Sequence, residues 1–218
     1  MIGFYNYTVY MTFLGLVSSA FGIMQAAAGH PLRAVLLLMF SGVCDMLDGK
    51  IARTRKKSTP EEKRFGIQLD SLSDIVCFGA LPAAIGAVLL TVTADKHGAW
   101  LRVINGTCAC LLVLCALIRL AYFNVTEEER QQTTGKRRTV YLGLPVTTSA
   151  LIFPLAYALS RVLPAPVNAW IYPFAMLVTA VLFITPIRVP KPHGIRLVIL
   201  SLIGLAEIGL IIWAAWFR

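Results

Sequence analysis

The sequence predicts an all-α integral membrane protein, a polytopic bundle of six to seven transmembrane helices. Of its 218 residues, 57% are hydrophobic and 14% are charged, and the mean hydropathy is +0.72. Soluble domains have roughly 45 to 50% apolar and about 25% charged residues. Apolar runs of roughly 20 residues, long enough to cross about 30 Å of hydrocarbon, recur along the whole chain. We therefore expect one membrane domain over residues 1–218 and no separate soluble domain.

Apolar runs and the polar residues between them define seven expected helices. The first run has no basic segment before it, which predicts a retained span rather than a cleaved signal. The charged stretch 125–142 is expected to be a solvated loop that contacts lipid headgroups. The expected helices cover residues 7–28, 32–57, 66–93, 98–123, 143–162, 165–185 and 195–217.

Positive charge is concentrated on one side of this topology. The loops after the second, fourth and sixth helices, together with Lys50 and Arg119, hold 15 of the 20 lysines and arginines. The positive-inside rule then places the N-terminus in the cytoplasm and the C-terminus outside, in the cell (inner) membrane. Loop placement explains the net charge of +9 better than a nucleic-acid partner does.

The cysteines favour a packing role. All five lie in apolar segments and none has metal-finger spacing, so we interpret them as small buried hydrophobic side chains rather than disulfides or ligands. They are Cys44, Cys77, Cys108, Cys110 and Cys115.

Four of the five aspartates fall within one window of thirty residues. Asp45 and Asp48 end the second expected helix, and Asp70 and Asp74 begin the third. Spacings of three and four residues place each pair on one helix face. The short basic loop between the helices makes them antiparallel neighbours, so we expect the four carboxylates to converge near one membrane surface.

Such a cluster calls for cations. Ionised carboxylates at mid-bilayer cost at least about 2.5 to 3.5 kcal/mol each, and they repel one another. Oxygen-only ligands favour Mg²⁺, Mn²⁺ or Ca²⁺ over zinc, and the window contains no histidine. Two ions a few ångströms apart would match the clamp used in phosphodiester chemistry.

Small residues accompany the aspartates. Gly49, Ala52 and Gly66 either leave room for a nucleotide or serve ordinary close packing of helices. Arg53 lies two turns beyond Asp45 and could either pair with a diphosphate or anchor the helix end at the cytoplasmic surface.

The segments D-M-L-D-G-K-I-A-R (45–53) and G-I-Q-L-D-S-L-S-D (66–74) together resemble the signature of the CDP-alcohol phosphatidyltransferase family. All four aspartates, both glycines, the alanine and the arginine occur in order. One feature differs, because twelve residues (54–65) separate the two segments where the family usually has eight.

Three further segments resemble the phosphatidylserine synthase branch of that family. They are F-G-I-Q-L-D-S-L-S-D-I-V-C-F-G-A-L-P-A (65–83), R-L-A-Y-F-N (119–124) and G-L-P (143–145). Cys77 stands where the branch commonly has serine, and Tyr122 where it commonly has a second arginine. The resemblance covers about residues 5–150, an expected catalytic core to which 151–218 adds further helices.

The resemblance implies transfer of the phosphatidyl group of CDP-diacylglycerol to L-serine with Mg²⁺ or Mn²⁺, by two ions, in a homodimer. It makes Asp45, Asp48 and Asp70 metal ligands and Asp74 both a ligand and the base for the acceptor hydroxyl. Arg119 and Asn124 are the candidates for binding serine, with topological anchoring as the alternative for Arg119. The residues expected to border the cytidine diphosphate are Gly49, Ala52, Arg53 and Gly66.

Two other functions stay open from the sequence. The same chemistry could use glycerol 3-phosphate, inositol phosphate or another alcohol as acceptor. A divalent-cation or proton-coupled transporter could also gather acidic residues in the membrane, and Glu207 in the last helix suits one. Transport predicts acids spread over the depth of several helices, whereas the four aspartates lie together, so Glu207 is expected to be a packed or interfacial side chain paired with a neighbour.

Overall fold

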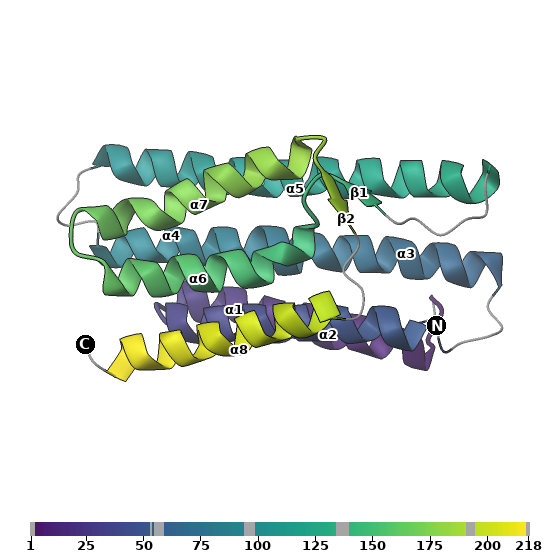
Figure 1. Cartoon of the computed structure of the whole chain (residues 1–218), viewed down its shortest axis with the longest axis horizontal. Coiled ribbons are helices and arrows are strands. Elements are labelled where there is room, and N and C mark those ends of the chain that lie inside the picture. The colour runs from purple at the N-terminus through teal and green to yellow at the C-terminus, as the bar shows by residue number, and fades with distance from the viewer. Residues whose placement is uncertain are drawn as a thin grey trace.

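The computed structural model describes residues 3–52, 54, 59–93, 99–133, 140–190 and 195–216. Long helices pack side by side along one axis, which confirms the predicted all-α bundle (Figure 1). A two-stranded antiparallel sheet, which the sequence did not predict, joins the segments after α5 and α7. The elements are α1 (Tyr10–Ala27), α2 (Pro31–Ala52), α3 (Pro60–Asp74), α4 (Leu81–Thr93), α5 (Ala99–Thr133), β1 (Val140–Leu142), α6 (Ser149–Val162), α7 (Val167–Ile184), β2 (Arg188–Pro190) and α8 (Ile195–Trp216).

Within the described residues, four helical stretches are long and apolar enough to cross a membrane: Tyr7–Ala27, Pro60–Leu89, Ala99–Arg130 and Val167–Ile184. Two shorter apolar stretches lie in α6 and α8. The α2 helix has 22 residues, but its last eight include two aspartates and a lysine, which lower its hydropathy. The described helices form seven continuous helical segments, here called rods, at the positions that the apolar runs predicted. The third rod consists of α3, the helical turn after it and α4.

The third rod begins six residues before its predicted start. The Thr59 hydroxyl accepts a hydrogen bond from the Glu62 N–H, and the Glu62 carboxylate accepts one from the Thr59 N–H. Pro60 follows at the first helical position, where its missing N–H costs no hydrogen bond. This capping box fixes the start of the helix within the stretch that was expected to be loop.

The fourth rod, α5, ends ten residues beyond its predicted end, so the expected solvated loop at 125–142 is wrong over its first part. Glutamate, arginine and glutamine are good helix formers, and their charge does not end a helix outside the membrane. Arg130 Nε donates to Glu127 Oε2 at 3.0 Å within this extension. With 35 residues, α5 is about 52 Å long, well beyond the hydrocarbon thickness.

The apolar core is formed mainly by side chains of α2, of the α3–α4 rod and of α5, α6 and α7. Gly42 allows α2 and α6 to pack closely, because a Cβ at this position would lie 2.5 Å from the Cβ of Ala150 on α6. The cysteines are free, and four of the five are buried as predicted. Cys110 is exposed on α5 and is the exception.

Candidate functional site

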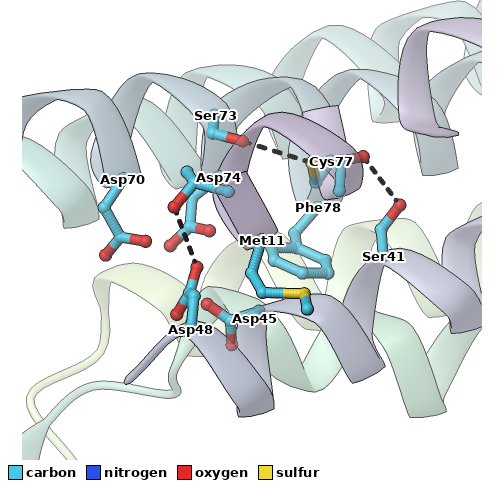
Figure 2. A pocket seen from close by; sticks show the side chains of 11 residues that line it. Met11, Ser41, Asp45, Asp48, Asp70, Ser73, Asp74, Cys77 and Phe78 are labelled. Atoms are coloured by element: carbon cyan, nitrogen blue, oxygen red, sulfur yellow. Dashed lines mark hydrogen bonds between the residues drawn. The ribbon is translucent and has the colours of Figure 1, made fainter. Parts of the chain in front are cut away.

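The aspartates of α2 and α3 converge at one end of the bundle. Asp45, Asp70 and Asp74 each offer a carboxylate oxygen, and these three oxygens lie within 4.8 Å of one another. Figure 2 shows the side chains approaching from two helices, with Asp48 beside them. The spacing of three residues on α2 and four on α3 produces this arrangement, because both pairs lie on the faces that the helices turn towards each other. The predicted convergence is therefore present.

Asp48 belongs to the same pocket but lies outside the set of three oxygens. Its Oδ2 accepts a hydrogen bond of 3.2 Å from the hydroxyl of Thr12 on α1. The sequence did not single out Thr12, although a hydroxyl in an apolar helix was a usable signal.

The pocket lies between α1, α2 and the C-terminal end of α3 with the residues that follow it, and it holds about 200 Å³ of empty space including open solvent. Small and weakly polar residues continue the wall beyond the carboxylates (Figure 2). The lining residues are Met11, Thr12, Gly15, Ser41, Asp45, Asp48, Asp70, Ser73, Asp74, Cys77 and Phe78.

A π-helical segment, Ile75–Ala80, follows Asp74 directly. The N–H of Leu81 donates to the carbonyl of Val76, five residues earlier. Pro82 has no N–H for the carbonyl four residues before it, which favours this wider turn. Single π turns inside α-helices are frequent at functional sites. The segment directs Cys77 and Phe78 into the wall of the pocket.

The chemistry of the donors fits a hard divalent cation. Asp74 is buried and Asp45 and Asp70 are half-buried, so their charges are only partly solvated. None of the ion pairs between described residues involves these aspartates. Clustered carboxylates with little water are stabilised when a cation replaces their protons, and oxygen ligands suit Mg²⁺ or Mn²⁺.

The residues expected to border a nucleotide do not line the pocket itself. Gly49 and Ala52 lie at the end of α2, and Ala52 is exposed. Gly66 lies one turn before Asp70, and a Cβ there would meet no atom within 4 Å, so the space beside it is open. Arg53 lies outside the described residues.

The two residues expected to bind an acceptor hold parts of the fold together. Arg119 is buried; its Nε donates to the carbonyl of Leu144 at 3.0 Å, and its guanidinium lies 5.1 Å from the ring centroid of Phe123. Arg119 is also close enough to Asp74 to attract it electrostatically.

Asn124 exchanges hydrogen bonds of 2.9 and 3.1 Å with the hydroxyl of Ser71. This exchange ties α5 to α3 between Asp70 and Asp74. Neither Arg119 nor Asn124 lines the pocket.

Glu207 lies on α8, away from this pocket. Its side chain is buried, which confirms that it is packed. The expected pairing with a neighbour is not found for its Oε2, which has no hydrogen-bond partner among the described residues.

An apolar helical bundle with a pocket of clustered carboxylates defines a class of membrane protein whose pocket could hold a metal ion. Residues 5–185 match the family described as CDP-alcohol phosphatidyltransferase. Because this match covers most of the chain, the protein belongs to that family.

Similar proteins include enzymes of serine phospholipid synthesis. The chain is 36% identical over 137 residues to a CDP-diacylglycerol–serine O-phosphatidyltransferase of Saccharomyces cerevisiae, covering 61% of this chain and 44% of the yeast protein. It is 28% identical over 184 residues to an archaetidylserine synthase of Methanothermobacter thermautotrophicus, covering 84% of this chain and 69% of the relative. A CDP-diacylglycerol–serine O-phosphatidyltransferase of Mycobacterium leprae is 27% identical over 187 residues, covering 85% of this chain and 58% of the relative. The chain thus spans less than two thirds of the yeast and mycobacterial proteins.

Proposed function

We propose that this protein transfers the phosphatidyl group of CDP-diacylglycerol to L-serine and forms phosphatidylserine and CMP. The observation that carries the proposal is the meeting of Asp45, Asp70 and Asp74 within 4.8 Å at one end of a membrane bundle. Family membership supports the class of chemistry, and the names of the relatives support serine as the acceptor.

In the proposed mechanism, Asp45, Asp48, Asp70 and Asp74 hold Mg²⁺ or Mn²⁺, as two ions. Such cations, when bound there, would supply positive charge beside the diphosphate of the substrate and beside the leaving group. The four carboxylates fix the cation site near one membrane surface, so that the polar head of the lipid would lie there while its acyl chains remain in the bilayer. Gly49, Ala52, Arg53 and Gly66 border the nucleotide, and the open space beside Gly66 supports its part in this assignment.

Asp74 is the proposed base. Its carboxylate takes the proton of the serine hydroxyl as the hydroxyl oxygen attacks the phosphorus that carries diacylglycerol. A new P–O bond to serine forms, the P–O bond to CMP breaks, and CMP leaves with the electron pair. Arg119 stabilises the pocket through its positive charge near Asp74 and through its hydrogen bond to the carbonyl of Leu144. We also propose that Arg119 and Asn124 contact the bound serine.

The orientation follows from charge. The helices α2, α5 and α7 run in the same direction, towards the side of the bundle on which α3 begins (Figure 1), and the basic loops follow the ends of these helices in the sequence. The positive-inside rule then makes this side cytoplasmic, in the cell membrane. A homodimer is part of the same proposal, on the family resemblance alone.

Competition between acceptors tests the function. The full chain in detergent, supplied with CDP-diacylglycerol and Mn²⁺ or Mg²⁺, is expected to release CMP when radiolabelled serine is added and to place the label in lipid. Excess unlabelled glycerol 3-phosphate or inositol phosphate should leave this labelling unchanged. CMP release with one of those alcohols instead of serine would change the acceptor, and no release with any alcohol would favour transport.

A further inference from the structure

We propose that Thr12 is a positioning residue whose hydroxyl fixes the orientation of the Asp48 carboxylate and so sets how tightly the pocket holds its divalent cation. The inference rests on the proposed function in one respect, because it takes the pocket to be a cation site. Thr12 lies outside the 45–74 segment that carries the family signature.

The first support is the close contact between α1 and α2 beside the pocket. A Cβ at Gly15 would lie 3.3 Å from the Cβ of Cys44, so the two helices approach closely there. The Ser41 hydroxyl on α2 lies within hydrogen-bond distance of the Gly15 carbonyl, at 3.0 Å, and of the Ser19 hydroxyl, at 2.7 Å, so polar contacts also join the two helices there. Thr12 lies one turn before Gly15 on the same face, which brings its hydroxyl to Asp48.

The second support is the direction of the Thr12 hydrogen bond. Threonines inside helices commonly donate to a carbonyl of their own helix. Thr107 and Thr126 do so here, each with a bond of 2.9 Å, to the carbonyls of Val103 and Tyr122. The hydroxyl of Thr12 instead donates across to α2, to Oδ2 of Asp48 at 3.2 Å. A hydroxyl has one proton to donate, so this bond commits it to the carboxylate.

The third support comes from the segment before α1, which contacts both helices that carry the aspartates. The Tyr7 hydroxyl lies 3.1 Å from the hydroxyl of Thr54, just after α2. On α3, the Asn6 side chain donates to Glu62 at 3.4 Å, and the ring of Phe4 meets that of Phe65 with centroids 5.5 Å apart. These contacts hold the start of α1, and with it Thr12, against the pocket.

The consequence follows from the position of Asp48. Its oxygens lie outside the set formed by the other three aspartates, so its contribution to a cation depends on how it is turned. A hydrogen bond that holds one carboxylate oxygen fixes the direction in which the other points. Loss of such outer hydrogen bonds typically lowers metal affinity by about 10- to 100-fold.

The test measures Mn²⁺ binding directly, by the electron paramagnetic resonance signal of free Mn²⁺ titrated into the full chain in detergent. Thr12→Val keeps the shape of the side chain and removes the hydroxyl, and we expect it to raise the Kd for Mn²⁺ by about tenfold. Thr12→Ser restores a hydroxyl and should return the Kd to within about twofold of the unchanged protein. Thr107→Val is the matched control, because it removes a hydroxyl from another helix away from the pocket, and it should leave the Kd unchanged.

A double-mutant cycle adds a second readout. If Thr12 acts through Asp48, Thr12→Val should weaken residual Mn²⁺ binding no further in an Asp48→Asn background. Should Thr12→Val not remain helical and monodisperse, Thr12→Ala takes its place in the same titration.

Equal Mn²⁺ affinity in Thr12→Val and the unchanged protein would overturn the inference, as would a Thr12→Ser variant as weak as Thr12→Val. Absence of Mn²⁺ binding in the unchanged protein would instead overturn the cation site itself, and with it the proposed function.

Discussion

Acidic side chains are buried at two places in the bundle, and the residues that surround them differ between the two places. At the α1–α2–α3 end, carboxylates from two helices meet and a hydroxyl reaches one of them. On α8, Glu207 is 5% exposed and shares its helix face with Ile211, which is 1% exposed. The α8 helix packs against α6 and contributes no residue to the lining of the carboxylate pocket.

The two places show two ways in which a membrane protein can accommodate buried acidic side chains. A lone carboxyl group among apolar neighbours can be carried as a neutral, packed side chain. Several carboxylates within 4.8 Å repel one another and need a shared positive charge. Proximity of several acids, rather than burial of one, therefore marks the place where cation chemistry is expected.

The largest effect is expected at Asp74. Asp74→Asn keeps the size of the side chain but cannot accept the proton of the acceptor, so turnover should fall by at least about 100-fold. Binding of CDP-diacylglycerol, measured with the metal present, should remain within a few-fold of the unchanged protein. Near-normal CMP release from this variant would remove Asp74 as the base.

Removal of the cation is expected to have the next largest effect, and it should affect the carboxylate pocket but not Glu207. Chelation is expected to abolish CMP release, and added Mn²⁺ should restore it. Binding at a concentration of 100 Kd stabilises a folded protein by about 2.7 kcal/mol, so Mn²⁺ should raise the Tm of the unchanged protein. Asp45→Asn should lose most of this rise and Glu207→Gln should keep it. An equal rise in Tm with Mn²⁺ in Asp45→Asn and Glu207→Gln would mean that the cation binds elsewhere.

A packing change near the pocket should have a smaller effect. Gly42→Ala would press a Cβ against Ala150, and overpacking of this kind costs about 1–3 kcal/mol. Gly66→Ala is the matched control for stability, because its Cβ would meet no atom within 4 Å. Thermal unfolding in detergent should show a lower Tm for Gly42→Ala than for Gly66→Ala. The reverse order would mean that α2 and α6 do not meet closely at Gly42.

The smallest effect is expected at Glu207. Glu207→Gln keeps the shape of the side chain, and Glu207 does not line the carboxylate pocket, so CMP release and the Tm should both stay close to those of the unchanged protein. Activity assays beside thermal unfolding check both values. A large loss of metal-dependent activity would tie Glu207 to function and revive the transport hypothesis.

Helix positions were largely predictable because each apolar run is long enough to define a helix without help from its neighbours. Helix ends were not, since they depend on short polar signals. The start of α3 is set by the Thr59–Glu62 capping box, and α5 continues through Glu127–Arg130 because charged residues support a helix outside the membrane. Both signals are present in the sequence, but hydropathy alone predicts a loop at both places.

The bundle and the convergence of the aspartates are predictable from the apolar runs and the aspartate spacing, because helix length and a spacing of three or four residues act within one helix or between chain neighbours. The hydrogen bonds of Asp48 to Thr12 and of Asn124 to Ser71 became visible once the helices were packed together. The tertiary structure also decided that a π-helical segment follows Asp74. Those contacts depend on the rotation and depth of helices distant in sequence, which are set by side-chain packing across the whole bundle.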